Sequence, residues 1–529
     1  MSYIALSQRD NDFGDAPEQA QDNEDSEVAA SGDRDPQQQP GVTRKQLWGL
    51  YLSHFLSTWN ARSYEFAAIL FTASAYPDTL TASSIRGILT TLSTLALSSA
   101  VGRWADQHPS RLQTLRIGIF VQRILVILAC GGWISIVGEV FVEGGFSGTG
   151  VKTGVAGSGH QQPFAGKPVV KGIIFAAVLL LGIGERLSAV GNMMVMERDW
   201  VPAIAATEPA PFLLSLNASM RRIDLTCKLL APLSISVLAL VASSVRVTAV
   251  CIAVINAVSV GIEWHTAYRV YRSCPSLRVP KAPSPPPVQA TRQQSVFRSW
   301  TQGLSLFFST EIWLPSLSLA LLYFPVLSFS ASMLTFLLNA GFPLSEITIA
   351  QTFSTLVEVF ATVASPWGVQ MMERKQPTAT AAAAAGIERM GLWGLWWQFT
   401  NLIPVTLLLF TLPTSGPPAF PSAALFIFLA LSRMGLWIFD LSAQTLVQTH
   451  VPEGRRSEYS GVEMGFISAA ELAQWVVTGV WAQTEDFKWL ATAGTVAVGA
   501  SLLAYMVWLR GRRGHLVHWE KVRWGECGN

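Results

Sequence analysis

The stretch HFLSTWNARSYEFAAILF, residues 54–71, reads as membrane-buried but carries His54, Arg62 and Glu65. A charged side chain near the centre of a spanning helix costs about 2.5–3.5 kcal/mol on insertion scales. Such residues therefore face a polar interior, where they pair with each other or serve a transported ion. We expect Arg62 and Glu65 to line a central cavity.

Two interpretations of Glu65 stay open. Positions 54, 61 and 65 lie on one face of a helix, because seven and eleven residues are close to whole turns. His54 and Glu65 are about 16 Å apart along the helix axis at 1.5 Å per residue, so one ion cannot bridge them. Glu65 is therefore either the one strong oxygen ligand at its level or the ion-pair partner of Arg62, three residues earlier.

Composition indicates a polytopic membrane protein. Of the 529 residues, 50% are apolar and only 14% are charged, about half the charged share of an average soluble protein. The net charge of +2 gives no indication of nucleic-acid binding. The five scattered cysteines predict neither a disulfide framework nor a zinc site. We find no P-loop, nucleophile elbow or HExxH motif, so an enzyme is not expected.

Apolar runs of about 20 residues or more, each able to cross a hydrocarbon core of about 30 Å, recur twelve times. They lie near residues 46–73, 82–102, 112–139, 170–194, 213–243, 246–271, 311–338, 345–372, 388–413, 419–449, 457–483 and 488–510. The segment 170–194 has the weakest support as a span because it includes Glu185 and Arg186. The expected fold is an all-α membrane protein.

The distribution of Lys and Arg among the short loops predicts the orientation. Basic residues recur on one side of the membrane, as at Arg103, Arg374 and Arg455, whereas the loops near 74–81, 339–345 and 414–421 contain none. The basic side is cytosolic by the positive-inside rule, and both termini lie there.

The remaining segments complete the predicted domain organisation. Residues 1–43 contain ten acidic and two basic residues, and we expect a disordered tail. A Pro-rich basic linker at 272–300 separates six-helix bundles at 44–271 and 301–511, a layout typical of transporters with a midplane site. The Gly-rich segment 140–169 is expected to be an outer loop, and 512–529 a cytosolic tail.

The stretch GRWADQHPSRL, residues 102–112, follows the second span and resembles the G-x-x-x-D…R loop of the major facilitator superfamily. Its glycine allows close helix approach, and Asp106 and Arg111 can form a breakable pair at an inner gate. The alternative is a loop that only obeys the positive-inside rule.

Five blocks together resemble the ferroportin family, the iron exporters of solute carrier family 40. In chain order they are LSTWNARSYEF (56–66), GRWADQHPSRL (102–112), MERDWVPAIA (196–205), LNASMRRIDLTCKLLAP (216–232) and RMGLWIFDLSAQTLVQ (433–448). The resemblance covers roughly residues 46–510. It implies a major facilitator fold and a transporter that moves Fe²⁺ out of the cytosol by alternating access, with proton exchange through Glu65 or Glu471.

The resemblance also implies two substrate-metal sites, and this chain departs from both. On the first helix, the family's Asp and His positions are Ala61 and Glu65. On the seventh span, where Pro325 favours a break, the family's Asp-Cys pair reads Ser330-Ala331. On the eleventh span, Gln474 stands at the family's His, with Glu471 where an Asp would be. We expect Glu65, Ser330, Glu471 and Gln474 to contact the metal; the alternative for Glu471 is a bond to a neighbouring helix.

By the same resemblance, Gln122, Asn256 and Glu263 fall where animal members bind a regulatory Ca²⁺. Oxygen ligands suit Ca²⁺, although the first-helix Asp of that site is Ala61 here. The alternative for Glu263 is a buried acid lining the cavity.

The remaining charged and polar residues are candidates for the gate. Asp199, Asn217, Arg221, Arg222 and Asp224 cluster at the cytosolic ends of the fourth and fifth spans. Asp440 is the expected carboxylate partner from the other half. The alternative is simple anchoring of the spans.

Other functions remain open at this stage. A broader carrier of Co²⁺, Ni²⁺ or Mn²⁺ fits the change from His to Glu at position 65, and a small organic solute fits the fold. The expected location is the plasma or vacuolar membrane. We expect a monomer in the lipid bilayer with no resident cofactor. No peptide regulator is expected, since animal members bind one near the Cys that is Ala331 here.

Overall fold

The structure is a computed structural model. It describes residues 42–76, 81–137, 168–242, 244–281, 296–325, 327–328, 333–334, 336–337, 340–373, 379–411, 419–481 and 486–513. In these residues it is all-helical, with no strand. The helices of the first half are α1 (Arg44–Ala75), α2 (Thr81–Gln107), α3 (Arg111–Ile136), α4 (Pro168–Met194), the π-helix η1 (Val195–Trp200), α5 (Val201–Ala205), α6 (Ala210–Ala242), α7 (Val245–Ser273) and α8 (Pro275–Arg278). Those of the second half are α9 (Val296–Ser309), α10 (Trp313–Leu321), α12 (Leu344–Glu373), α13 (Ala379–Thr411), α14 (Ala419–His450), the 3₁₀ helix η2 (Glu453–Arg455), α15 (Arg456–Val480) and α16 (Phe487–Arg513).

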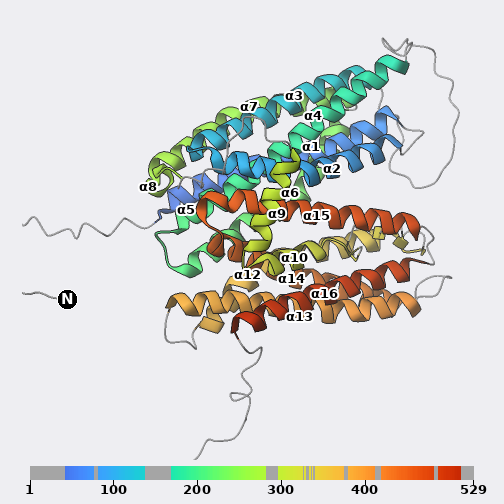
Figure 1. Cartoon of the computed structure of the whole chain (residues 1–529). Helices are drawn as coiled ribbons and strands as arrows, with labels where there is room; N and C mark the ends of the chain where they lie inside the picture. The colour runs from blue at the N-terminus through green and yellow to red at the C-terminus, as the bar shows by residue number, and fades with distance from the viewer. Residues whose placement is uncertain are drawn as a thin grey trace, which may run out of the picture. The chain divides into compact units, whose positions relative to one another are not determined.

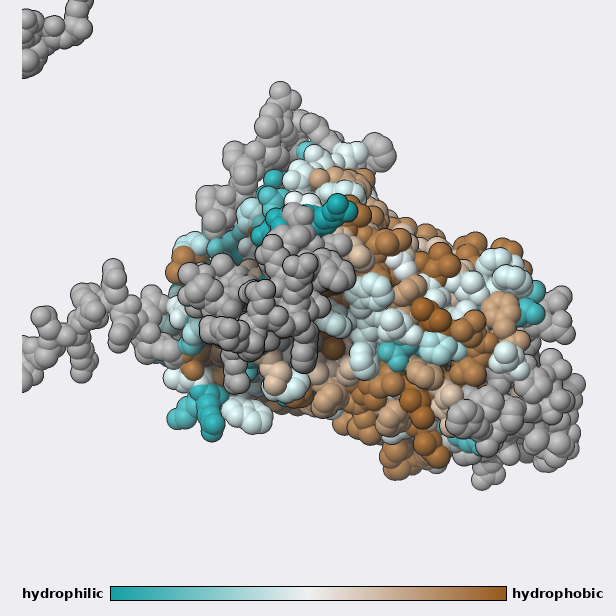
Figure 2. Space-filling view, turned by 90° about the horizontal axis from the view of Figure 1, so that it is seen from below, coloured by the Kyte–Doolittle hydropathy of each residue, from teal (hydrophilic) through white to brown (hydrophobic). Residues whose placement is uncertain are grey.

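Eight helices of the described part are long and apolar enough to cross a membrane, and α9 with α10, bent by 110°, adds a ninth if the pair forms one span. Helices α1 and α15 have comparable lengths but carry more polar residues, including the charged side chains of the site described below. Large apolar side chains point outward, among them Leu240, Val480 and Val507. Apolar residues cover much of the face seen in Figure 2. An outward-facing apolar surface of this kind suits contact with lipid.

The helices fall into two groups within the unit Gly41–Asn529. In the first group α1, α2, α3, α4, α6 and α7 pack on one another, and in the second α10, α12, α13, α14 and α16 do so (Figure 1). Helix α15 packs on both α10 and α2, and α6 packs on both α1 and α12. These two helices therefore carry much of the contact between the groups.

Helices α2 and α15 cross closely at two glycines. A Cβ atom at Gly102 would collide with the backbone carbonyl of Ser457, and one at Gly461 with the backbone of Ser98. The Ser98 hydroxyl donates a 2.6 Å hydrogen bond to the Gly461 carbonyl. The sequence interpretation of Gly102 as a site of close helix approach agrees with this contact.

Three local features differ from a simple series of straight helices. Helix α10 ends at Leu321, four residues before Pro325, as expected because a proline ring clashes with the carbonyl of residue i−4. A second bend, between α9 and α10, was not predicted from the sequence. Residues 275–278 and 296–300 are helical although both lie in the predicted linker.

Candidate functional site

A cavity of about 320 Å³ lies between the two groups of helices. Its walls come from α1, α3, α4, η1, α6, α10, α14 and α15. A second pocket of about 310 Å³ adjoins it, lined by α1, α2, α3, α4 and α15. Arg62, Glu65, Arg186 and Glu471 line both, so the two spaces meet at these charged side chains.

Helix α1 places several of its polar residues in this region, among them Arg62 and Glu65. Its start is fixed by Thr43, whose backbone N–H and hydroxyl both donate to the Gln46 side chain. Further along, Arg62 bridges two acids: Nη1 lies 3.1 Å from Glu65 Oε2, and Nη2 lies 3.3 Å from Asp224 Oδ1 on α6. The pairing of Glu65 with Arg62 is therefore present, and Glu65 also faces the cavity with 47% of its side chain exposed.

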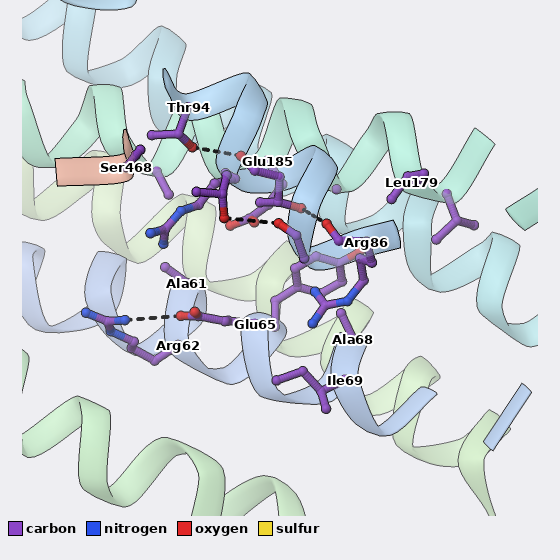
Figure 3. A pocket seen from close by; sticks show the side chains of 18 of the residues that line it. Ala61, Arg62, Glu65, Ala68, Ile69, Arg86, Thr94, Leu179, Glu185 and Ser468 are labelled. Carbon is purple, nitrogen blue, oxygen red and sulfur yellow. Dashed lines mark hydrogen bonds and ion pairs between the residues drawn. The ribbon is translucent and has the colours of Figure 1, made fainter. Parts of the chain in front are cut away.

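The second pocket is lined by Glu65, by Glu471 and by a third acid, Glu185 of α4. Figure 3 shows Glu65 and Glu185 in this pocket. The Gln122 side chain donates a 2.9 Å hydrogen bond to Glu185 and accepts one of 2.9 Å from Asn192. Glu185 is a site residue that was not predicted, although an acid within an apolar run is a signal for one.

Among the described residues, no three His, Cys, Asp or Glu side chains lie close enough to hold a metal ion. Glu65 and Glu471 therefore offer few ligands in this conformation. Gln474 is half-buried on α15 but is not among the residues lining either cavity. Ser330 lies outside the described residues.

Next to the central cavity, two charge pairs join the first group of helices to the second. Arg221 of α6 lies 2.7 Å from Asp440 of α14 and 3.6 Å from Asp224. Arg198 of η1 lies 3.1 Å from Glu463 of α15.

The amide of Asn217 donates a 2.6 Å hydrogen bond to Gln448 of α14. Arg222 differs from its neighbours, because its guanidinium donates to Ser219 of its own helix at 2.9 Å.

A further layer of charge pairs lies toward the loop after α2. Arg111 is 2.7 Å from Asp199 and also pairs with Glu453. Asp106 accepts a 2.8 Å hydrogen bond from the backbone N–H of Glu458 at the start of α15. The expected direct pair between Asp106 and Arg111 is therefore wrong, since each residue bonds a different part of the second group. Arg103, which pairs with Glu458 at 2.8 Å, was missed because its partner is 355 residues away.

The residues expected to hold a regulatory Ca²⁺ are each engaged by other groups. Gln122 bonds Glu185 and Asn192, whereas Asn256 donates to the carbonyl of Ile252. Glu263 lies 2.6 Å from the Arg123 guanidinium, and both side chains are fully buried.

The Asn60 amide also donates to Glu263, at 3.1 Å. A cation at Glu263 would have to displace Arg123, so these residues do not fit a Ca²⁺ site as arranged.

Comparisons with known proteins agree with this architecture. The family model for Ferroportin1 (FPN1) matches residues 44–498. Solute carrier family 40 member 1 of Oryza sativa subsp. japonica is 29% identical over 486 residues, which cover 89% of this chain and 93% of the relative.

Two solved structures share the fold. A bacterial homologue of the iron transporter ferroportin in the outward-facing state aligns with a TM-score of 0.70 at 21% identity, over 88% of this chain and 100% of its own. The major facilitator superfamily proton:xylose symporter XylE bound to 6-bromo-6-deoxy-D-glucose aligns with a TM-score of 0.55 at 12% identity, over 89% of this chain and 96% of its own. The fold is thus of the major facilitator type. With a family model that matches nearly all of its helical part, this multi-pass membrane protein belongs to the ferroportin family.

Proposed function

We propose that the protein transports Fe²⁺ across a membrane, out of the cytosol. The main observation in support is the polar cavity between the two groups of helices, where Glu65 of α1 and Glu471 of α15 face the same pocket. Fe²⁺ accepts carboxylate ligands, and a site with few ligands can release the ion as well as bind it. The family's first-helix Asp and His are Ala61 and Glu65 here, so the proposed ligand set is richer in oxygen.

Twelve spans with both termini in the cytosol complete the proposed topology. They are α1, α2, α3, α4, α6 and α7 in one half, then the broken pair α9–α10 and α12 to α16 in the other. Arg455 lies 4.0 Å from Glu458 at the ion-paired end of the cavity, and Arg456 follows it at the start of α15, so the positive-inside rule supports a cytosolic position for that end.

Alternating access is the proposed mechanism. The charge pairs Arg111–Glu453, Arg198–Glu463 and Arg221–Asp440 hold the two halves together on the cytosolic side. Breaking them would open the cavity to the cytosol, and forming them would commit the ion to the other side. The likeness to a structure solved in an outward-facing state supports this assignment of the conformation.

A carrier of several divalent metals is a second candidate. Glu65 stands where the family has a His, and a carboxylate at this position favours no single ion among Fe²⁺, Co²⁺, Ni²⁺ and Mn²⁺. An organic solute is a third candidate, supported only by the fold. We further propose proton exchange through Glu65 or Glu471, a monomeric state in the plasma or vacuolar membrane, and no peptide regulator.

The test is ion flux in liposomes that contain the purified full-length chain. Wild type should move Fe²⁺ and Co²⁺, and Glu65→Gln and Glu471→Gln should each reduce the flux at least about tenfold. Glu311→Gln is the matched control, because Glu311 has the same chemistry but an 80% exposed side chain outside both cavities. A folded wild type that moves neither ion would sink the proposal and leave the organic solute as the alternative.

A further inference from the structure

His54 is a buried imidazole with one unused nitrogen. It lies on α1 in the wall of the central cavity and is only 5% exposed. Its ring hydrogen-bonds the backbone of Met220 on α6. Its Nε2 atom has no hydrogen-bond partner among the described residues. The bond to Met220 therefore involves Nδ1.

The chemistry of this bond fixes the tautomer. The backbone N–H of Met220 is inside a helix and is committed to the helical bond, so the carbonyl of Met220 is the acceptor. Nδ1 consequently carries the hydrogen, and Nε2 keeps its lone pair. Imidazoles that bind metals have this arrangement, with one nitrogen donating to a carbonyl and the other free for the ion.

The wall of the same cavity also carries a carboxylate. Asp224 lines the same cavity and interacts electrostatically with His54. It is four residues from Met220 and so lies one turn along the same face of α6. Two guanidiniums neutralise Asp224, with Arg62 at 3.3 Å and Arg221 at 3.6 Å.

We propose that His54 Nε2 and an Asp224 carboxylate oxygen form a weak binding site for a divalent transition metal, separate from Glu65 and Glu471. One nitrogen and one carboxylate ligand favour Fe²⁺, Co²⁺ or Ni²⁺ over Ca²⁺ and Mg²⁺, which prefer oxygen alone. His54 lies about 16 Å from Glu65 along the axis of α1, whereas Asp224 is joined to Glu65 through Arg62, so the site is a second binding position next to Glu65 on the path of the ion.

Arg62 can promote release of the metal from this site. It bonds Asp224 and Glu65 at once, so a metal arriving at Asp224 competes with the guanidinium. When the ion leaves, Arg62 compensates the carboxylate again. Water completes the coordination of an ion held by only two side chains, which keeps the affinity low.

The test is Co²⁺ binding to the purified full-length protein, followed by calorimetry and by X-ray absorption at the cobalt edge. His54→Asn is the informative variant, because the Asn amide can still donate to the Met220 carbonyl but has no nitrogen at the Nε2 position. In calorimetry, His54→Asn should weaken one of the two Co²⁺ binding events about tenfold or more. In X-ray absorption, it should remove the scattering from the imidazole ring. Asp224→Asn should weaken the same event, whereas His265→Asn, on the exposed face of α7, should change neither signal.

The inference rests on the proposed metal transport, and its failure can be told apart from failure of that proposal. Unchanged Co²⁺ binding in His54→Asn, with intact flux in wild type, overturns the His54 site alone. The His54 site is also overturned if X-ray absorption of the wild type at saturating Co²⁺ shows only oxygen ligands. This outcome needs no variant. A wild type that neither binds nor moves Co²⁺ overturns both.

Discussion

At the scale of single residues, Arg62 is the cation that a metal would have to displace in the proposed sites. It bridges Glu65 and Asp224, so both acids are partly neutralised when no metal is bound. Arg62→Gln should therefore tighten Co²⁺ binding roughly three- to tenfold, because a competing charge is lost. It should also slow Co²⁺ release into the lumen of liposomes. Calorimetry and stopped-flow flux measure the two effects, and Arg269→Gln on the exposed face of α7 is the control. Weaker binding in Arg62→Gln would contradict this account.

The buried pair Arg123–Glu263 leads to a second prediction at this scale. Ca²⁺ should not stimulate Co²⁺ flux in wild type, because the guanidinium already holds the carboxylate. Arg123→Gln should lose roughly 3–5 kcal/mol of stability, since it leaves a buried charge unpaired. Millimolar Ca²⁺ should recover part of the lost Tm in this variant but not in Arg123→Gln combined with Glu263→Gln. Thermal unfolding in detergent, with and without Ca²⁺, measures both. Stimulation of wild-type flux by Ca²⁺ would show instead that the ion displaces Arg123.

The sequence predicted those site residues that are anomalous in their own segment. Arg62 and Glu65 are charged residues in an apolar run, and they do line the cavity. The partners could not be predicted in the same way. Asp106 bonds a backbone N–H of α15, and Arg123 bonds a residue 140 positions away, so both contacts depend on how the helices pack.

At the scale of elements, α2 and α15 cross in close contact at Gly102 and Gly461, on the proposed cytosolic side, and we expect this crossing to limit how closely the two helices approach. Gly102→Ala should prevent full closure, because the new Cβ meets a backbone carbonyl that cannot rotate away. A Cys placed at Ser457 in a cysteine-free background should then react faster with an impermeant maleimide from the cytosolic side. Gly87→Ala is the control on the same helix, since nothing lies within 4 Å of its Cβ position. Equal labelling in both variants would mean that this crossing does not limit closure.

A comparison of predicted and observed helix boundaries shows which helices can be predicted from the sequence. Most predicted spans begin and end within a few residues of an observed helix, but the predicted span 311–338 does not, because α10 ends at Leu321 and the chain bends between α9 and α10. The break before Pro325 follows from proline chemistry. Helix α13 begins at Ala379 rather than near 388, because the alanine run extends the helix beyond the apolar core. The π-helix η1 has no such signal, yet it directs Arg198 toward Glu463 and Asp199 toward Arg111. Its wider turn depends on those tertiary contacts.

At the scale of the whole molecule, the proposed alternating access requires that the contacts between the halves on the proposed cytosolic side break and form again. Arg103–Glu458 is a suitable test of this step, because the pair joins α2 to α15 and lines neither cavity. Arg103→Glu and Glu458→Arg should each favour the state open to the cytosol, since each places like charges opposite one another. The double exchange should restore the closed state, with a coupling energy of roughly 0.5–3 kcal/mol.

The readout is the distance distribution between spin labels at the exposed positions Gln113 on α3 and Thr449 on α14. Each single variant should shift the distribution to longer distances and lower the Co²⁺ flux, while Co²⁺ binding in the cavity stays the same. The double variant should recover both the short distances and the flux. Additive effects, with no recovery in the double variant, would mean that this pair anchors the helices and takes no part in closing the cytosolic side.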